Sequence, residues 1–222
     1  VNGRSSAEFF RAAAEAAGKE IVYEGFSPLG TTEYGTYITQ IQDSGADALF
    51  TVEQGASAVA FTQQLDQFDA LGQFQTVLGF NAYSEPLFPA LGDTIEGFYN
   101  NVGYVNSDPN PLNVAFVEAW EAKNGEKPYY VIADNYLGAQ TLFEAIKAAG
   151  SSDVEAVKTA LRGLTFESFA GPVTMRGEDG QMIRPTYVGK LVKGADGNIG
   201  WEIVATVPGD QVIGEVSADC KL

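Results

Sequence analysis

The chain has 222 residues, and its 13 Lys and Arg side chains are outnumbered by 29 Asp and Glu, which gives a net charge of −16. An acidic chain without a basic cluster repels phosphate backbones, which argues against nucleic-acid binding. The chain contains no histidine, so it has no imidazole general base, no Ser-His or Cys-His dyad and no His-ligated metal site. No apolar run approaches the roughly 20 residues that span a membrane, and we expect a soluble protein.

Helical and strand patterns alternate through the first half of the chain. Ser5 and Glu8 have the spacing of a capping box, which predicts a helix through Ala17. Such alternation indicates βαβ units, and hence a parallel sheet with helices on both faces. The expected elements are a helix at 5–17, a strand at 21–23, a helix at 31–44, a strand at 48–52, a helix around 61–68, a strand at 76–78, a helix at 87–91 and a strand at 97–99.

The pattern changes in the second half of the chain, after a polar and Pro-rich loop at 106–111 that is a candidate domain boundary. Two long helical patterns follow, one through Phe116 and Trp120 and one through Leu142 and Ala149. A third helix is expected from a capping box at 152–155 to Gly163. Beyond it the period is that of strands, at 173–175, 186–188 and 201–204, with hairpin turns at 178–180 and 195–197.

Polar and aromatic residues follow two of the expected parallel strands, where ligands bind in sheets of this kind. They are Glu53, Gln54 and Ser57 after one strand and Phe80 and Asn81 after the next. The competing interpretation is that both stretches are ordinary polar loops.

No motif for chemistry accompanies these candidates. The chain has no phosphate-binding loop, no calcium loop, no Cys/His cluster and no nucleophile elbow. We therefore expect no catalysis, no metal and no cofactor. Non-covalent binding of a small molecule is the function that the sequence leaves open.

Several segments of the chain match one protein family in order and spacing. They are Gly25 to Tyr34, Ile38 to Phe50, Pro89 to Gly92, Ala145 to Ser151 and Gly171 to Arg176. In these segments the chain resembles the type I solute-binding proteins of ABC importers, and within them the branched-chain amino acid (leucine/isoleucine/valine) binding proteins.

The resemblance implies an α/β periplasmic binding protein type I fold, with two Rossmann-like lobes joined by hinge strands and the first lobe incomplete in this chain. It implies that 1–101 form the second lobe without its first strand, 102–108 a hinge, 109–187 the returning part of the first lobe, and 188–222 a hinge crossing and a tail on the second lobe. Such proteins usually exceed 300 residues, so we expect a chain that begins inside a longer protein.

The resemblance also assigns contacts to individual residues. The family's aromatic contact before the first helix falls on Asn2, and the acid that pairs with an α-ammonium falls on Asn81. A second contact falls on Ser57 or the neighbouring Gly55 and Ala56. Because an amide carries no charge, either Glu53 is the ammonium partner or the solute is not an α-amino acid. Tyr136 lies near the start of a helix that faces the cleft in the family.

The implied protein is a periplasmic carrier, made with a signal peptide, that captures an amino acid or a related carboxylate or amide. Its partners would be this solute and an ABC permease, and it would be a monomer without enzymatic activity. The alternative is the ligand-sensing domain of a receptor or regulator, and an enzyme on a similar scaffold ranks third. The resemblance pairs Cys220 with a cysteine outside this chain, and a free thiol is the competing view.

Overall fold

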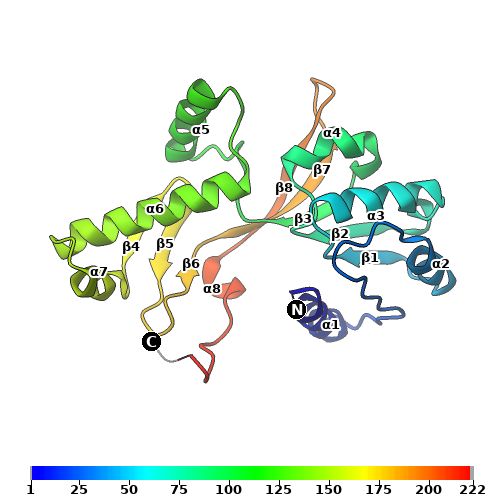
Figure 1. Cartoon of the computed structure of the whole chain (residues 1–222), viewed down its shortest axis with the longest axis horizontal. Helices are drawn as coiled ribbons and strands as arrows, with labels where there is room; N and C mark the ends of the chain where they lie inside the picture. Colours follow the sequence, from blue (N-terminus) through cyan, green and yellow to red (C-terminus); the bar gives the residue numbers. More distant parts are fainter. Residues whose placement is uncertain (1, 221–222) are drawn as a thin grey trace. The chain divides into compact units, whose positions relative to one another are not determined.

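The computed structural model describes residues 2–220, and at Asn2 the backbone alone. The chain forms two compact units. Unit 1 contains the residues up to Asn101 and Gly189–Glu202, and unit 2 contains Val102–Val188 and the residues from Ile203 onward. The strands β3 (Tyr99–Val102), β7 (Thr186–Lys193) and β8 (Ile199–Val207) carry the chain from one unit to the other. Figure 1 shows the elements in sequence colours.

The first three strands form a parallel sheet in unit 1. β1 (Ala48–Thr51) pairs with β2 (Thr76–Phe80), which pairs with β3, and β7 and β8 follow in the order β1-β2-β3-β7-β8. α3 (Ala56–Gln67) connects β1 to β2, as a parallel pair requires. The predicted α/β fold with a parallel sheet is confirmed.

Helices cover both faces of this sheet (Figure 1). On one face, α1 (Asn2–Ala16) places the ring of Phe10 flat on Phe50 of β1, with 4.0 Å between the ring centroids. On the other face, α2 (Gly35–Asp43) packs against α3 through a buried cluster that includes Ile38, Phe61 and Leu65. Full burial of such a side chain contributes about 1.5–3 kcal/mol, so this cluster anchors α2 and α3 over the sheet.

Short helical turns link β2 to β3. They are η2 (Glu85–Leu87), α4 (Phe88–Leu91) and η3 (Gly92–Ile95), while η1 (Leu71–Gln73) precedes β2. Phe88 and Leu91 join a core cluster with Val77 of β2 and Leu191 of β7, and the ring of Phe88 meets that of Trp201 edge-on. The segment is therefore held against the sheet by its apolar side chains.

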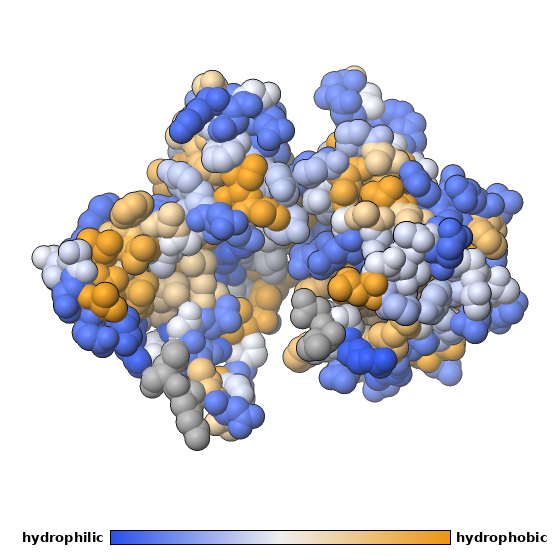
Figure 2. Space-filling view, viewed as in Figure 1, coloured by the Kyte–Doolittle hydropathy of each residue, from blue (hydrophilic) through white to orange (hydrophobic). Residues whose placement is uncertain are grey.

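Unit 2 combines three longer helices with a small antiparallel sheet. The helices are α5 (Pro111–Asn124), α6 (Tyr130–Ala149) and α7 (Val154–Leu161). β4 (Thr165–Ser168), β5 (Gly171–Met175) and β6 (Met182–Ile183) pair in that order, and α8 (Gly209–Val212) follows β8. Phe116 of α5 stacks on Phe169 at 4.5 Å within the unit's core. Apolar side chains also reach the surface over α6 and α7, where Phe143 and Val154 are exposed (Figure 2).

Several sequence-based expectations are corrected by the structure. Ser5 and Glu8 do not form a capping box, because α1 already begins at Asn2 and both residues lie inside it. Residues 21–23 are not a strand, because the sheet ends at β1 and a strand exists only by pairing. α2 begins four residues later than Thr31, after Tyr34. At α7 the cap is Asp153, whose Oδ1 accepts the backbone N–H groups of residues 155 and 156.

Arg176 holds the segment after β8 within unit 2. The Arg176 guanidinium forms an ion pair with Asp179 at 2.5 Å and donates to the carbonyl of Gly214 at 2.7 Å. Within 188–222, where the sequence predicts a hinge crossing and a tail, Gly189–Glu202 group with unit 1 and the residues from Ile203 onward with unit 2. Assignment of the two units to lobes stays a prediction, as does a disulfide at Cys220. No helix in the described part of the chain is long and apolar enough to cross a bilayer.

Candidate functional site

The carboxyl ends of three parallel strands form one edge of the unit 1 sheet. Thr51 at the end of β1 pairs with Gly79, and Gly79 pairs in turn with Asn100 of β3. Because neighbouring strands lie about 4.8 Å apart, the residues that follow these positions lie close together. We call this part of unit 1, from Glu53 across Asn81 to Asn101, the strand edge.

Glu53 is the charged group of the strand edge, and two hydroxyls hold its carboxylate. Ser27 donates to Oε1 at 2.5 Å, and Tyr34 donates to Oε2 at 3.1 Å. The Glu53 backbone N–H donates to the hydroxyl of Thr51 at 3.3 Å. Glu53 is half-buried, whereas Tyr34 is only 2% exposed. The carboxylate is therefore fixed in direction by donors that come from two other segments of the chain.

Tyr34 connects Glu53 to the start of α3. Burial raises the pKa of the Tyr34 hydroxyl, the nearby Glu53 carboxylate acts in the same direction, and a hydrogen bond with Ser57 lowers it. Tyr34 thus stays protonated at neutral pH and remains a donor. Gly55 precedes α3 with a φ of 57°, and no side chain caps the helix. Ser57 lies in its first turn, where backbone N–H groups favour an anionic or polar partner.

Amide side chains make up the middle of the strand edge. The backbone N–H of Asn81 donates to Oδ1 of Asn101 at 2.8 Å, and Nδ2 of Asn101 donates back to Oδ1 of Asn81 at 3.3 Å. Asn81 has a φ of 50°, a conformation that Asn tolerates better than most residues. The first bond fixes the backbone of Asn81 beside the end of β3, and the second fixes its side chain.

Asn100 supports this loop from below. Its Oδ1 accepts the backbone N–H of Ala82 at 3.3 Å, and its Nδ2 donates to the carbonyl of Asn101 at 2.8 Å. Asn100 is 3% exposed, so these bonds satisfy a buried amide. A Cβ at Gly79 would lie 2.6 Å from the same Oδ1, so the loop depends on a glycine at that position.

An aromatic surface borders the strand edge on the face that α1 covers. The ring of Phe80 lies 6.4 Å from that of Phe50, which in turn carries Phe10. Phe50 is only partly buried, and Phe80 is 37% exposed at the end of β2. An exposed aromatic ring beside fixed polar groups is the composition of a small-molecule site.

The structure brings most of the predicted site residues to this edge. Glu53, Ser57, Phe80 and Asn81 lie along it, and Gln54 is exposed in the same loop. The prediction at Asn2 falls on a side chain outside the described residues. Tyr136 belongs to unit 2, where it is 49% exposed and its ring lies 4.6 Å from that of Phe116.

Sequence reasoning did not find Ser27, Tyr34 or Asn101 as site residues. In the sequence, Tyr34 falls within the helix expected at 31–44, and Ser27 falls within a segment that matches the family. Their partners lie 26, 19 and 20 positions away in the sequence, so no local spacing indicates the contacts. The one signal in the sequence that could indicate such a site residue is a polar residue at the end of a predicted strand.

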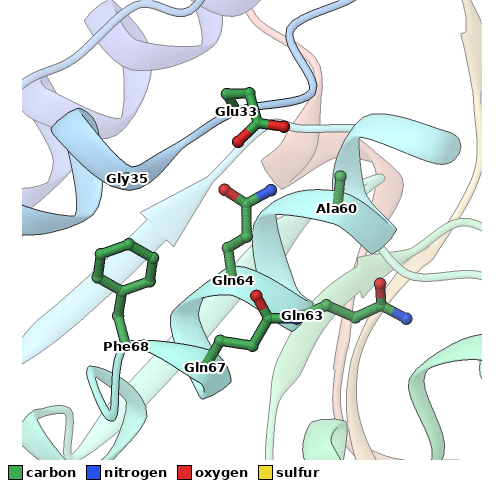
Figure 3. A pocket seen from close by; sticks show the side chains of 7 residues that line it. All are labelled: Glu33, Gly35, Ala60, Gln63, Gln64, Gln67 and Phe68. Atoms are coloured by element: carbon green, nitrogen blue, oxygen red, sulfur yellow. The ribbon is translucent and has the colours of Figure 1, made fainter.

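A concavity of unit 1, of about 270 Å³, lies between the start of α2 and the later turns of α3 (Figure 3). Its lining is Glu33, Gly35, Ala60, Gln63, Gln64, Gln67 and Phe68. Both ends of the Gln64 amide are hydrogen-bonded, because Oε1 accepts the backbone N–H of Tyr34 at 2.7 Å and Nε2 donates to the carbonyl of Thr32 at 2.7 Å. Gln64 therefore holds the loop that positions Tyr34.

The residues that the structure describes form no cluster of metal ligands. No group of three or more Cys, Asp or Glu side chains in residues 2–220 is placed to hold a metal ion. The strand edge can bind a small molecule by hydrogen bonds, charge and aromatic contact.

Comparison with known proteins identifies the family. A sequence profile described as periplasmic binding protein matches residues 1–197. The chain belongs to this family. The family resemblance inferred from the sequence is thus confirmed, together with the periplasmic binding protein type I fold.

Individual members of the periplasmic binding protein family differ in what they bind. The chain is 27% identical over 186 residues, 79% of its length and 46% of the relative's, to Leu/Ile/Val-binding protein homolog 8 of Brucella abortus (strain 2308). An amino acid ABC transporter substrate-binding protein from Pseudomonas fluorescens Pf-5 matches with a TM-score of 0.89 and 25% identity, covering 99% of this chain and 59% of the other. A solute binding protein of Rhodopseudomonas palustris HaA2 in complex with p-hydroxybenzoic acid matches with a TM-score of 0.82 and 25% identity, covering 92% and 57%.

This member of the periplasmic binding protein family spans about half the length of the curated relatives that it matches. Its counterparts of known structure are likewise covered to less than two thirds.

Proposed function

We propose that the chain belongs to an extracytoplasmic solute-binding protein of an ABC transporter, which captures a small amino acid, carboxylate or amide at the strand edge and performs no chemistry on it. The observation that carries this proposal is the set of fixed polar groups at the strand edge. Glu53 and Asn81 are held by hydrogen bonds before a solute arrives, and Ser57 lies beside them in the first turn of α3. Preorganised groups lose little entropy on binding.

The family and its members support the same proposal. Proteins named for binding leucine, isoleucine and valine, and others in complex with hydroxybenzoate, share this fold. We propose that units 1 and 2 correspond to the lobes of such carriers and that a solute favours their closed arrangement. In that scheme the solute shifts a population of two states, and an ABC permease receives the closed form.

A thermal-shift screen of the complete protein tests the proposal. The panel contains L-amino acids, benzoates, aliphatic carboxylates and amides. A true solute at 100 times its Kd stabilises the folded state by about 2.7 kcal/mol, which shifts Tm by several degrees. No shift with any member of the panel contradicts the proposal.

A pair of variants ties binding to the strand edge. Asn81→Gly removes the amide and keeps a residue that tolerates the positive φ at this position, so the loop backbone is preserved. We expect it to weaken binding of the solute found by the screen. Asn135→Ala is the matched control, because the Asn135 side chain bonds only within α6, to the carbonyl of Val131 at 2.8 Å.

A further inference from the structure

Glu53 is a fixed carboxylate without a cationic partner. Among the residues that the structure describes, no Lys or Arg forms an ion pair with it, and its bonds are those to Ser27, Tyr34 and Thr51. A carboxylate offers about four lone-pair positions, and the two hydroxyls use two of them. This half-buried carboxylate therefore has acceptor capacity that the described residues do not use.

The lack of a cation extends over the whole strand edge. Residues 20–122 contain no Lys or Arg, and all of β1, β2, β3, α2 and α3 lie within that stretch. The basic side chains of α1 have contacts elsewhere, since Arg11 pairs with Glu24 at 3.1 Å and the Arg4 guanidinium lies 4.1 Å from the ring centroid of Phe26. On β7, Lys193 pairs with Asp93 at 2.5 Å, and the Lys190 ammonium lies 5.6 Å from the ring centroid of Tyr99, at the start of β3 and away from its carboxyl end.

These charges discriminate between the classes of solute that members of the family bind. A carboxylic acid without an amine would approach Glu53 as a like charge and would meet no Lys or Arg on β1, β2, β3, α2 or α3, where the uncapped N–H groups at the start of α3 are the groups that favour an anion. An ammonium group would meet a carboxylate already oriented by two donors, and a charge-assisted hydrogen bond is about twice as strong as a neutral one. The exposed ring of Phe80 at the same edge suits an apolar substituent.

We propose that Glu53 is the ammonium-binding residue of the strand edge, so that the solute carries an amine and aromatic or aliphatic acids without one are rejected. This inference rests on the proposed function and narrows it. Asn81, to which the family resemblance assigns the ammonium partner, is instead a neutral group that donates and accepts beside it.

Matched pairs of compounds test the inference in the complete protein. Isothermal titration compares L-leucine with 4-methylpentanoate, L-phenylalanine with 3-phenylpropanoate, and both with 4-hydroxybenzoate. Each pair differs by the amine alone. We expect at least one amine to bind more than tenfold tighter than its partner, a difference of about 1.4 kcal/mol or more.

Two variants test whether Glu53 causes the preference for an amine. Glu53→Gln should lower the affinity for the bound amine at least tenfold and reduce the preference over its des-amino partner. Glu33→Gln, an identical change at an exposed position of the same unit, should leave both affinities within twofold. If Glu53→Gln does not fold, the wild-type compound pairs still decide the question.

The possible failures are distinguishable. If an acid without an amine binds as tightly as its amine partner, or if Glu53→Gln keeps the amine's affinity, the inference is wrong while the carrier function stands. If no compound of the thermal-shift panel and none of the matched pairs binds, both the inference and the proposed function are overturned.

Discussion

Replacing Gly79 with alanine should destabilise the strand edge, because Gly79 packs against the buried residues that support it. The new Cβ would lie 2.6 Å from Oδ1 of Asn100, 2.8 Å from the ring of Tyr83 and 2.9 Å from Cβ of Ala82. All three neighbours are buried, at 3%, 2% and 0% exposure, so none can move into solvent. Overpacking of this kind costs about 1–3 kcal/mol.

We therefore expect Gly79→Ala to lower the free energy of unfolding by about 2 kcal/mol and Tm by about 4–8 °C. Urea denaturation followed by circular dichroism measures the free energy of unfolding, and a thermal melt measures Tm. Gly72→Ala is the matched control, because nothing lies within 4 Å of a Cβ built there, and it should leave stability unchanged or slightly raised. A loss below about 0.5 kcal/mol for Gly79→Ala, the range of surface substitutions, would refute the close packing beneath Asn81.

Two further predictions concern titratable groups. Burial raises the pKa of Glu85, a hydrogen bond from Trp201 opposes it, and Oε1 has no partner among the described residues. Glu85→Gln should therefore raise Tm at pH 7, and this gain should vanish below about pH 4, where the carboxyl is protonated in both folded and unfolded states. A gain that persists at pH 4 would contradict this explanation. The hydrogen bond from Arg176 lowers the pKa of Asp179 to about 2. Its stabilising effect is present above the ordinary Asp pKa near 4 and is lost as the pH falls through about 2. Arg176→Gln should loosen the segment around Gly214, which limited proteolysis would detect as faster cleavage there, and cleavage at the wild-type rate would count against the contact.

The elements that could be predicted are those whose pattern is local. The apolar run at Ala48–Thr51 and the spacing of Phe61 and Leu65 predicted β1 and α3, because burial of one face determines both. The strand expected at 21–23 was wrong, since pairing depends on a neighbour that no local pattern reveals. β3 begins at Tyr99, two residues later than expected, and strand boundaries depend in the same way on the partner's register.

The candidate site was predictable in position and not in detail. Glu53, Ser57 and Asn81 follow strands, and parallel strands bring such residues to one edge. The donors Ser27 and Tyr34 reach Glu53 only through the packing of α2 on α3, which involves side chains distant in sequence. The sequence left the role of Glu53 open between two alternatives. The absence of a cation on the surrounding elements is what favours one of them.

A crystal structure of the complete protein with the solute from the thermal-shift screen tests the central claim most directly. We expect the solute to lie at the strand edge, with a polar atom within hydrogen-bond distance of Glu53 or Asn81. A solute bound away from that edge, for example in the glutamine-lined concavity between α2 and α3, would contradict the account.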